Sequence, residues 1–260
     1  MVGRLLLLGM LTGVLAGLVV FGFARVFGEP PVERAIAFEA HMEKAHTDHA
    51  HTDHAHTDQT KGDTPEPELV DRATQAGLGL FVAVVVYAAA VGGLFALVFA
   101  FVYGRFARLA ARPTAALLAA GAFVSLVLVP TLKYPANPPA VGDPETIGSR
   151  TALYFAMLVI SVAALIFAIG LARRLARRHG SWNAGLLGGA AYVIIVAIAA
   201  YALPTVNEVP EQFSPVVLWN FRIAALGIQV VLWTTVGLLF GFLAERVVGH
   251  SLGSAQPKPY

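Results

Sequence analysis

The sequence predicts an all-α integral membrane protein with six transmembrane helices, and three observations support this prediction. Apolar residues make up 57% of the chain and charged residues only 13%, against roughly 45–50% and about 25% in soluble domains. The apolar residues gather into long blocks. Fifteen of the 16 acidic residues fall in three of the connections between those blocks. We therefore expect a single membrane domain over residues 1–260, with both termini in the cytoplasm (N-in/C-in).

The transmembrane spans are predicted from the length of each apolar block. A helix needs about 20 mainly apolar residues to cross a bilayer. The blocks that reach this length are 5–24, 77–103, 114–132, 151–172, 182–203 and 216–243. The first block follows Arg4 as in a signal peptide, but it exceeds the roughly 7–15 apolar residues of such a peptide, and no A-x-A cleavage site follows. We therefore expect it to be retained as a span.

The charges of the connections predict the orientation of the spans. Two short connections are basic: "GRFARLAARP" contains three arginines and "RRLARRHGS" contains four. Basic loops stay in the cytoplasm by the positive-inside rule. The segments that then face outward are 25–76, 133–150 and 204–215. All 16 acidic residues except Glu245 lie in those segments, in agreement with this orientation.

The first outward segment contains a histidine repeat. Residues 45–59 read "AHTDHAHTDHAHTDQ", and the surrounding sequence has no hydrophobic face. We therefore expect 29–74 to be an extracytoplasmic His/Asp-rich loop that is mostly disordered. The histidines are spaced alternately by three and two residues, so pairs of imidazoles lie together in either a helical or an extended backbone. The expected metal ligands are His46, His49, His51, His54, His56, Asp48, Asp53 and Asp58.

The composition of the repeat favours metal capture over a polar spacer, which would be better built from Ser or Gly. Imidazole and carboxylate ligands fit several divalent transition metals and do not choose among them. Because the ligands must be deprotonated, capture should weaken as the pH falls towards about 5. We expect the repeat to collect metal at the outer face and not to be the translocation site.

The spans have no ionisable residue near their centres, in contrast to most ion pumps and channels. Their polar side chains include Ser125, Ser161, Gln229, Thr234 and Thr235. The chain contains no cysteine, which excludes disulfides and thiolate metal sites. It has no phosphate-loop or other nucleotide-binding motif, and no HExxH or nucleophile–base arrangement. We therefore expect neither an enzyme nor an organic cofactor, and the absence of a basic, aromatic stripe argues against nucleic-acid binding.

Polar chemistry is then expected at the outer ends of the helices. In "LKYPANPPAVGDPETIGSRT", Asp143 precedes a proline and an acidic residue, as at a helix N-terminus, so capping and metal ligation both remain open. "LPTVNEVPEQFSPVVLWNFR" contains a second cluster before a helix start. The proposed outer vestibule consists of Asp143, Glu145, Asn207, Glu208, Glu211 and Arg222. The alternative is an interfacial belt, with Trp219 at the headgroups and Arg222 paired with an acid or a phosphate.

Small residues predict close helix packing. Gly9, Gly13 and Gly17 share one face of the first span, and Gly237 and Gly241 form a weaker instance in the last span. Such faces let two helix backbones approach closely. A helix of the same chain is the expected neighbour, and a partner subunit is the alternative.

Several of these segments resemble the CbtA family of predicted cobalt transporter subunits over nearly the whole length. The resemblance lies in the glycine-rich first span, the histidine-rich loop, "KYPANPPAVGDPETIG", "NEVPEQF", and "LWNFR" followed by "LGIQVVLW". It implies cobalt uptake connected with cobalamin synthesis, usually alongside CbtB, a small one-span subunit with its own histidine motif. It supplies no set of metal ligands.

The expected function is therefore a membrane subunit of a divalent transition-metal uptake system, multi-pass in the lipid bilayer of a bacterial or archaeal cytoplasmic (inner) membrane. Co(II) is the expected substrate, with Ni(II) and Zn(II) as alternatives. Histidines on the outer face favour import, because a trap is useful where metal is dilute. The competing interpretation is a non-transporting, membrane-anchored metal-buffering or assembly subunit.

Overall fold

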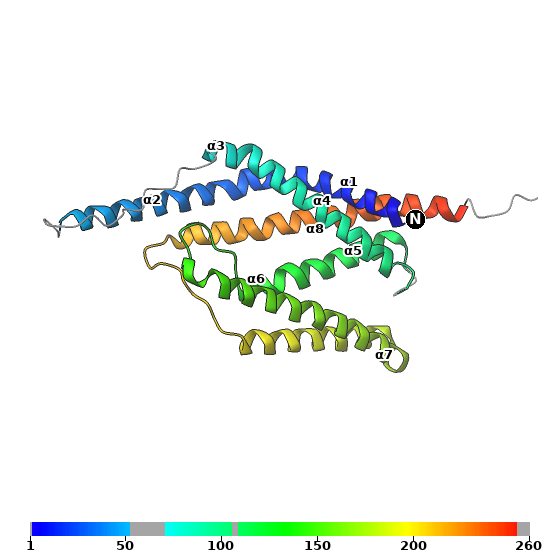
Figure 1. Cartoon of the computed structure of the whole chain (residues 1–260). Coiled ribbons are helices and arrows are strands. Elements are labelled where there is room, and N and C mark those ends of the chain that lie inside the picture. The colour runs from blue at the N-terminus through cyan, green and yellow to red at the C-terminus, as the bar shows by residue number, and fades with distance from the viewer. Residues whose placement is uncertain (1, 53–70, 106–108, 254–260) are drawn as a thin grey trace, which may run out of the picture.

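The computed structural model describes residues 2–52, 71–105 and 109–253. Figure 1 shows these residues as an elongated set of helices that run along roughly one direction. Over the described ranges the chain has helices and no strand, so the all-α class is confirmed. Five helices are long and apolar enough to cross a membrane: Val2–Met42, Arg72–Val102, Ala111–Lys133, Pro144–Ala202 and Pro215–Val247. The chain is therefore a membrane protein with several apolar helices.

The first rod consists of α1 (Val2–Phe23), the π-helical turn η1 (Ala24–Gly28) and α2 (Glu29–Thr52), which follow one another without a break. Pro30 and Pro31 follow η1 after one residue, Glu29. A proline cannot donate an N–H, and its ring crowds the carbonyl four residues earlier. A wider π turn before the prolines accommodates that crowding, which lets the helix continue through them.

The helix α2 corrects the expectation of a loop that begins at residue 29, because residues 29–52 are helical. Alanine, glutamate, methionine and lysine favour a helix here. The segment also has an apolar contact that the sequence pattern did not reveal: Ala35 is fully buried, and the ring of Phe38 lies 5.1 Å from that of Phe213. Residues 53–70 of the expected loop lie outside the described residues.

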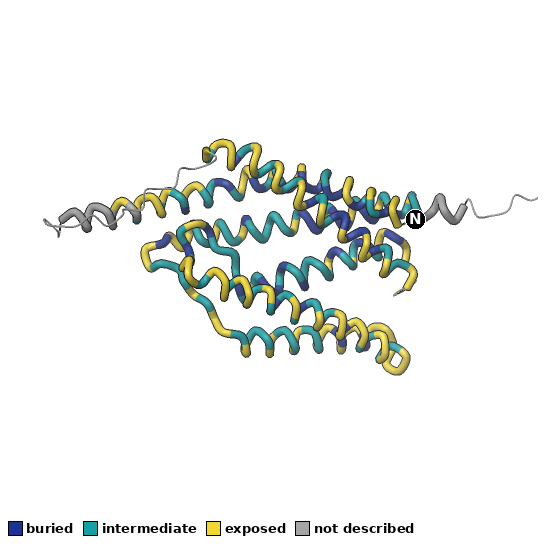
Figure 2. Tube along the Cα trace, in the orientation of Figure 1, coloured by how far each residue is buried: buried dark blue, intermediate teal, exposed yellow. Residues whose placement is uncertain are grey.

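The second rod consists of α3 (Arg72–Thr74), the π turn η2 (Gln75–Gly79) and α4 (Leu80–Val102). It packs along α1, and together with α5 and α8 these helices enclose the main apolar core. Phe95, Phe99 and Phe240 stack edge to face within that core. Figure 2 shows the buried residues gathered where these helices meet.

A third rod and a helical hairpin complete the fold. The third rod consists of α5 (Ala111–Ala122), the π turn η3 (Phe123–Leu128) and α6 (Val129–Lys133), and Pro130 again follows the π turn. After an irregular segment and η4 (Pro144–Thr146), α7 (Ile147–Ala202) folds back at Gly180, whose φ of 76° and ψ of 160° are not helical. Figure 1 shows the two arms of α7 beside each other. The last helix is α8 (Pro215–Gly253).

The turn within α7 accounts for the difference between six expected spans and five long apolar helices. The expected spans 151–172 and 182–203 lie on either side of Gly180, inside α7 except for the last residue, Leu203. The arms contact each other through Ser161 and Tyr192, whose hydroxyl oxygens are 2.8 Å apart. The second arm is exposed over most of its surface (Figure 2), and Val193 and Ile198 are each 63% exposed. Such a surface suits contact with lipid.

The connections fall into two groups at opposite ends of the bundle. Figure 1 shows the start of α1, the connection from α4 to α5 and the turn of α7 at one end. The tip of α2 and the connections before α7 and before α8 lie at the other end. Since the basic connections are in the first group and most acidic residues are in the second, the fold separates the charges that the sequence assigned to two sides of a membrane.

Candidate functional site: a cleft and its polar mouth

A cleft of about 1770 Å³ lies between the first arm of α7 and the wall formed by α4, α5, η3, α6 and α8. Most of its lining is apolar, from residues such as Leu94, Leu117 and Ile166. One end opens beside the connections that precede α7 and α8, where Asn207 and Glu208 line it. We refer to this end, formed by residues 135–150 and 204–212, as the mouth.

Glu208 holds the two connections of the mouth together. One carboxylate oxygen, Oε2, accepts a hydrogen bond from the backbone N–H of Asp143 at 2.8 Å, and the other, Oε1, accepts one from the Thr146 hydroxyl at 2.8 Å. Arg150 Nε lies 3.3 Å from Oε2. The Asp143 N–H, the Thr146 hydroxyl and the charge of Arg150 lower the pKa of Glu208 from its ordinary value, against a smaller opposing effect of burial. The carboxylate is thus charged and already occupied by donors.

Asp143 caps η4, the short 3-10 helix that leads into α7. Its side-chain oxygen accepts a hydrogen bond from the Glu145 N–H at 2.9 Å, and Pro144 occupies the first position of η4. Arg150, one helical turn into α7, donates to the Asp143 carbonyl at 3.1 Å. The sequence left two roles open for Asp143, helix capping and metal ligation, and the geometry shows that it caps a helix.

Arg222 connects α8 with the mouth through neutral oxygens. Its Nη2 donates to the Asn137 side-chain oxygen at 3.0 Å and its Nε to the Ala136 carbonyl at 3.3 Å. Both of these partners are neutral, so the described residues give Arg222 no acidic partner, and its pairing with a headgroup phosphate stays a prediction. Trp219 is 65% exposed, as expected of a side chain at a membrane surface.

The remaining vestibule residues are not brought to one point. Glu145 and Glu211 are exposed, and Asn207 is an exposed residue at the rim of the cleft. Among the side chains that the structure describes (residues 2–42, 44, 71–105 and 109–247), no three or more His, Asp or Glu are placed so that they could hold a metal ion. The mouth is thus a hydrogen-bonded structure and not a preformed metal cage.

The histidine repeat begins at the same end of the molecule. His46, Asp48, His49 and His51 fall in the last turns of α2, whose tip extends past the mouth in Figure 1. The other expected ligands, Asp53, His54, His56 and Asp58, lie outside the described residues.

The glycine faces lie against helices of the same chain. A Cβ atom built on Gly9, Gly13 or Gly17 would meet α4, through Gly92, Ala88 and Val85 respectively. A Cβ on Gly237 would overlap the Ala119 side chain of α5, and one on Gly241 would lie 3.1 Å from Ala115. Both faces therefore serve packing inside one chain.

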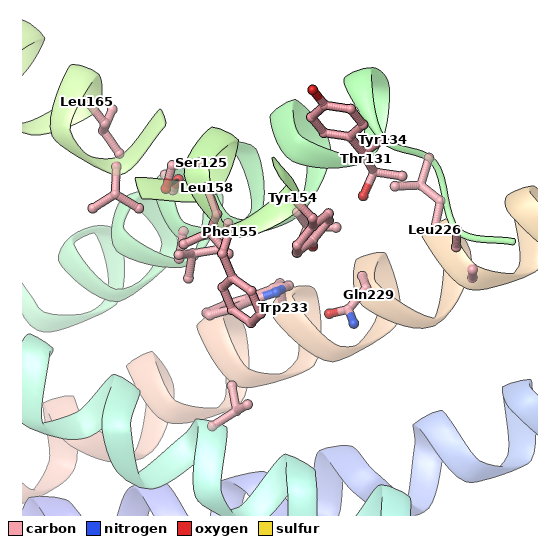
Figure 3. Close-up of a pocket in the computed structure, with 18 of the residues that line it drawn as sticks. Ser125, Thr131, Tyr134, Tyr154, Phe155, Leu158, Leu165, Leu226, Gln229 and Trp233 are labelled. Carbon is pink, nitrogen blue, oxygen red and sulfur yellow. Dashed lines mark hydrogen bonds between the residues drawn. The ribbon is translucent and has the colours of Figure 1, made fainter. Parts of the chain in front are cut away.

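Sequence reasoning missed several residues of the cleft and its mouth. Thr146, Arg150 and Asn137 complete the hydrogen bonds of the mouth. Deeper in the cleft lie Thr131, Tyr154 and Trp233, together with Ser125 and Gln229 (Figure 3). The cleft itself has no local signal, because its walls come from distant parts of the chain.

Comparison with known proteins identifies a family that the chain matches. Residues 2–245 match the family described as "Probable cobalt transporter subunit (CbtA)". No curated protein matches the chain, and no solved structure matches it. The matched range contains all the helices described above up to the last turns of α8. Since the match covers nearly the whole length, the chain belongs to the CbtA family of probable cobalt transporter subunits.

Proposed function

We propose that this chain is the membrane subunit of a cobalt uptake system that captures divalent metal at its outer face through the histidine repeat and delivers it to the mouth of the cleft. One observation carries the proposal. Ala35, Val141 and Phe213 form a small buried cluster, with Phe38 and Val209 packed against it. This cluster fixes α2, which leads into the repeat, to both connections that form the mouth.

The charge distribution supports the direction of transport. The arginine-rich connections lie at one end of the bundle, and the repeat begins at the other. By the positive-inside rule the repeat then faces outward and both termini face the cytoplasm, with six membrane crossings if each arm of α7 crosses once. A metal trap on the outer side favours uptake. We place the chain in the inner membrane of a bacterium or archaeon.

Within this proposal, the repeat and the mouth have different tasks. Imidazoles bind and release Co(II), with Ni(II) and Zn(II) as competitors. The carboxylates around the mouth attract cations, while Glu208 sets its geometry. A small CbtB-like one-span subunit is the proposed partner, and cobalamin synthesis the proposed use of the metal. No catalytic step is assigned to the chain.

Accumulation of radiolabelled cobalt in cells tests the proposal with three forms of the chain. These are the intact chain, a form lacking residues 45–58, and a form in which the five histidines of the repeat are replaced by glutamine, which preserves length and polarity. We expect both altered forms to lose uptake at submicromolar cobalt and to regain it at saturating cobalt. Loss at saturating cobalt would contradict the capture role, and equal accumulation with and without the protein would contradict uptake.

The non-transporting alternative, a metal buffer or assembly subunit, is favoured by the absence of a metal cage in the described residues. It predicts that purified protein binds cobalt while proteoliposomes containing the protein and its partner show no cobalt flux. Flux above that of protein-free liposomes would exclude this alternative.

A further inference from the structure

The cleft is long enough to cross the hydrocarbon core of a bilayer. Arg150 and Arg173 both line it, from opposite ends of the first arm of α7. At a helical rise of about 1.5 Å per residue, they lie about 35 Å apart along the helix axis, and the hydrocarbon core is about 30 Å thick. Thr114, in the first turn of α5, lines the cleft at the Arg173 end. The cleft therefore joins the mouth with the end that carries the basic connections (Figure 1).

Polar side chains from four segments line the deeper part of this cleft. They are Ser125 of η3, Thr131 of α6, Tyr154 of α7 and Gln229 of α8 (Figure 3). Polar groups within a membrane generally face the interior of a bundle or a water-filled cavity.

Two polar atoms in the cleft wall have no hydrogen-bond partner among the described residues: Gln229 Oε1 and Trp233 Nε1. Trp233 is only 9% exposed and lies one turn after Gln229 on α8, so the acceptor and the donor share one face of the helix. Figure 3 shows both side chains at the cleft. Lipid tails offer no hydrogen bond to such atoms, whereas water offers both a donor and an acceptor.

We propose that this cleft is the water-lined route by which the divalent cation crosses the membrane, and that Gln229 accepts hydrogen bonds there from the water shell of the cation. The inference rests on the proposed uptake function and adds the route to it. The waters around a cation point their hydrogens outward. Carboxamide and hydroxyl oxygens in the wall therefore have the right polarity to receive them.

The neutral character of these side chains suits passage better than storage. Conduction requires a site that binds a cation strongly enough to admit it and weakly enough to release it. Gln229, Ser125 and Tyr154 bind a hydrated cation less tightly than carboxylates would. Apolar residues such as Phe155 and Leu158 line the same cleft, and an apolar constriction in a pore opposes leakage by dewetting.

Cysteine labelling tests the water content of the cleft, because the chain contains no cysteine of its own. A charged methanethiosulfonate reagent reacts with a thiolate, which forms in water and not in lipid. The test variants are Gln229→Cys and Ala225→Cys, both at cleft-lining positions. The matched control is Val230→Cys, which adjoins Gln229 but is 44% exposed on the outside of the bundle. In membrane fragments open on both sides, we expect both test variants to react at least about tenfold faster than the control.

Reaction of both test variants as slowly as Val230→Cys would overturn the inference, because lipid or a partner helix would then fill the cleft. Ala225→Cys exchanges one small side chain for another, so it decides the question even where Gln229→Cys fails to fold. Equal labelling of all three variants after denaturation in detergent establishes that each thiol is present and reactive.

Cobalt transport gives a second readout. Gln229→Leu keeps the side-chain volume but removes the acceptor, and we expect its uptake rate at saturating cobalt to fall at least about tenfold. Thr234→Val, which removes a hydroxyl outside the cleft lining, should transport at the normal rate. A normal rate in Gln229→Leu would overturn the role of Gln229. If the intact chain moved no cobalt, the uptake function would fail, while the labelling would still decide whether the cleft holds water.

Discussion

The carboxylate of Glu208 accepts a hydrogen bond from the backbone N–H of Asp143 at 2.8 Å. The two residues belong to different connections, one before α7 and one before α8. Because Thr146 and Arg150 also contact this carboxylate, Glu208 has little free capacity to bind a metal. Its position indicates that it shapes the mouth, and this role can be separated from ligation by experiment.

The substitution Glu208→Gln tests the structural role. The amide keeps the shape of the side chain but loses the charge that pairs with Arg150, and its NH2 group cannot accept the hydrogen bond that the Thr146 hydroxyl donates to the carboxylate. We expect the melting temperature of the purified protein in detergent to fall by several degrees. Cobalt uptake should fall at every cobalt concentration, not only at low ones. Glu211→Gln, at an exposed position, is the control and should change neither property. A higher half-saturating cobalt concentration with normal stability would indicate a ligand instead.

Acid should remove the stabilisation that Glu208 provides. The pKa of Glu208 lies below its ordinary value of 4.5, mainly because the Asp143 N–H donates to it and also because of Thr146 and Arg150. A carboxyl with a lowered pKa stabilises the folded state fully above its unfolded pKa, and this contribution is lost as the pH falls through the folded pKa. The melting temperatures of the intact chain and Glu208→Gln should therefore differ near neutral pH and converge below pH 4.5. A difference that stayed constant into acid would contradict the assignment.

The packing of α1 on α4 depends on the absence of a side chain at Gly13. A Cβ atom there would overlap the Ala88 carbonyl and lie 2.7 Å from the Ala89 Cα, so the helices would have to separate. We expect Gly13→Ala to lower the free energy of unfolding by about 1–3 kcal/mol. Gly22→Ala, in the same helix but facing open space, is the control and should be neutral or slightly stabilising. Chemical denaturation of both variants in detergent measures the difference.

Part of this fold follows directly from local sequence. The apolar block 77–103 contains the whole of α4, and the spacing of Gly9 and Gly13 marked the face that packs on it. The Asp143–Pro144 pair predicted a helix start, and a capped start is present. Each of these signals acts within a few residues, through hydrogen bonds or helical periodicity.

Other features depend on contacts between distant residues and left no local signal. The helix α2 extends beyond the expected span because Phe38 packs on Phe213, which lies in another connection. The partner of Arg222 is Asn137 and not a nearby acid, because folding brings α8 beside the segment before α7. Gln229 was visible as a polar residue in a span, but its place at the cleft follows only from how α7 and α8 are arranged.

The turn between the arms of α7 requires glycine at position 180. Its φ of 76° with ψ of 160° is a backbone conformation that side chains with a Cβ rarely adopt. We expect Gly180→Ala to lower the free energy of unfolding by about 1–3 kcal/mol. Gly185→Ala lies in the helical second arm, where a Cβ meets open space, so it should raise stability by about 0.5–1 kcal/mol. If both variants had the same stability, the two arms would not depend on a turn at residue 180.

Arg222 of α8 makes two hydrogen bonds to the mouth, and the one to the Asn137 side chain should be stronger than the one to the Ala136 carbonyl. Arg222 donates to the Asn137 side chain at 3.0 Å, and both residues line the cleft. Hydrogen bonds to a charged group are worth about 1.5–3 kcal/mol. We therefore expect the stability losses of Arg222→Gln and Asn137→Ala to be non-additive, with a coupling of about 2 kcal/mol in a double-mutant cycle.

The control for this cycle is Arg34→Gln, because Arg34 is an exposed arginine of α2 and should combine additively with Asn137→Ala. Denaturation of the single and double variants in one detergent supplies all the required free energies. Strict additivity of Arg222→Gln and Asn137→Ala would show that the contact does not hold the mouth together. In that case Glu208 would be the contact that joins the two connections of the mouth. Glu208→Gln should then disorder the mouth to the same extent in the intact chain and in Arg222→Gln.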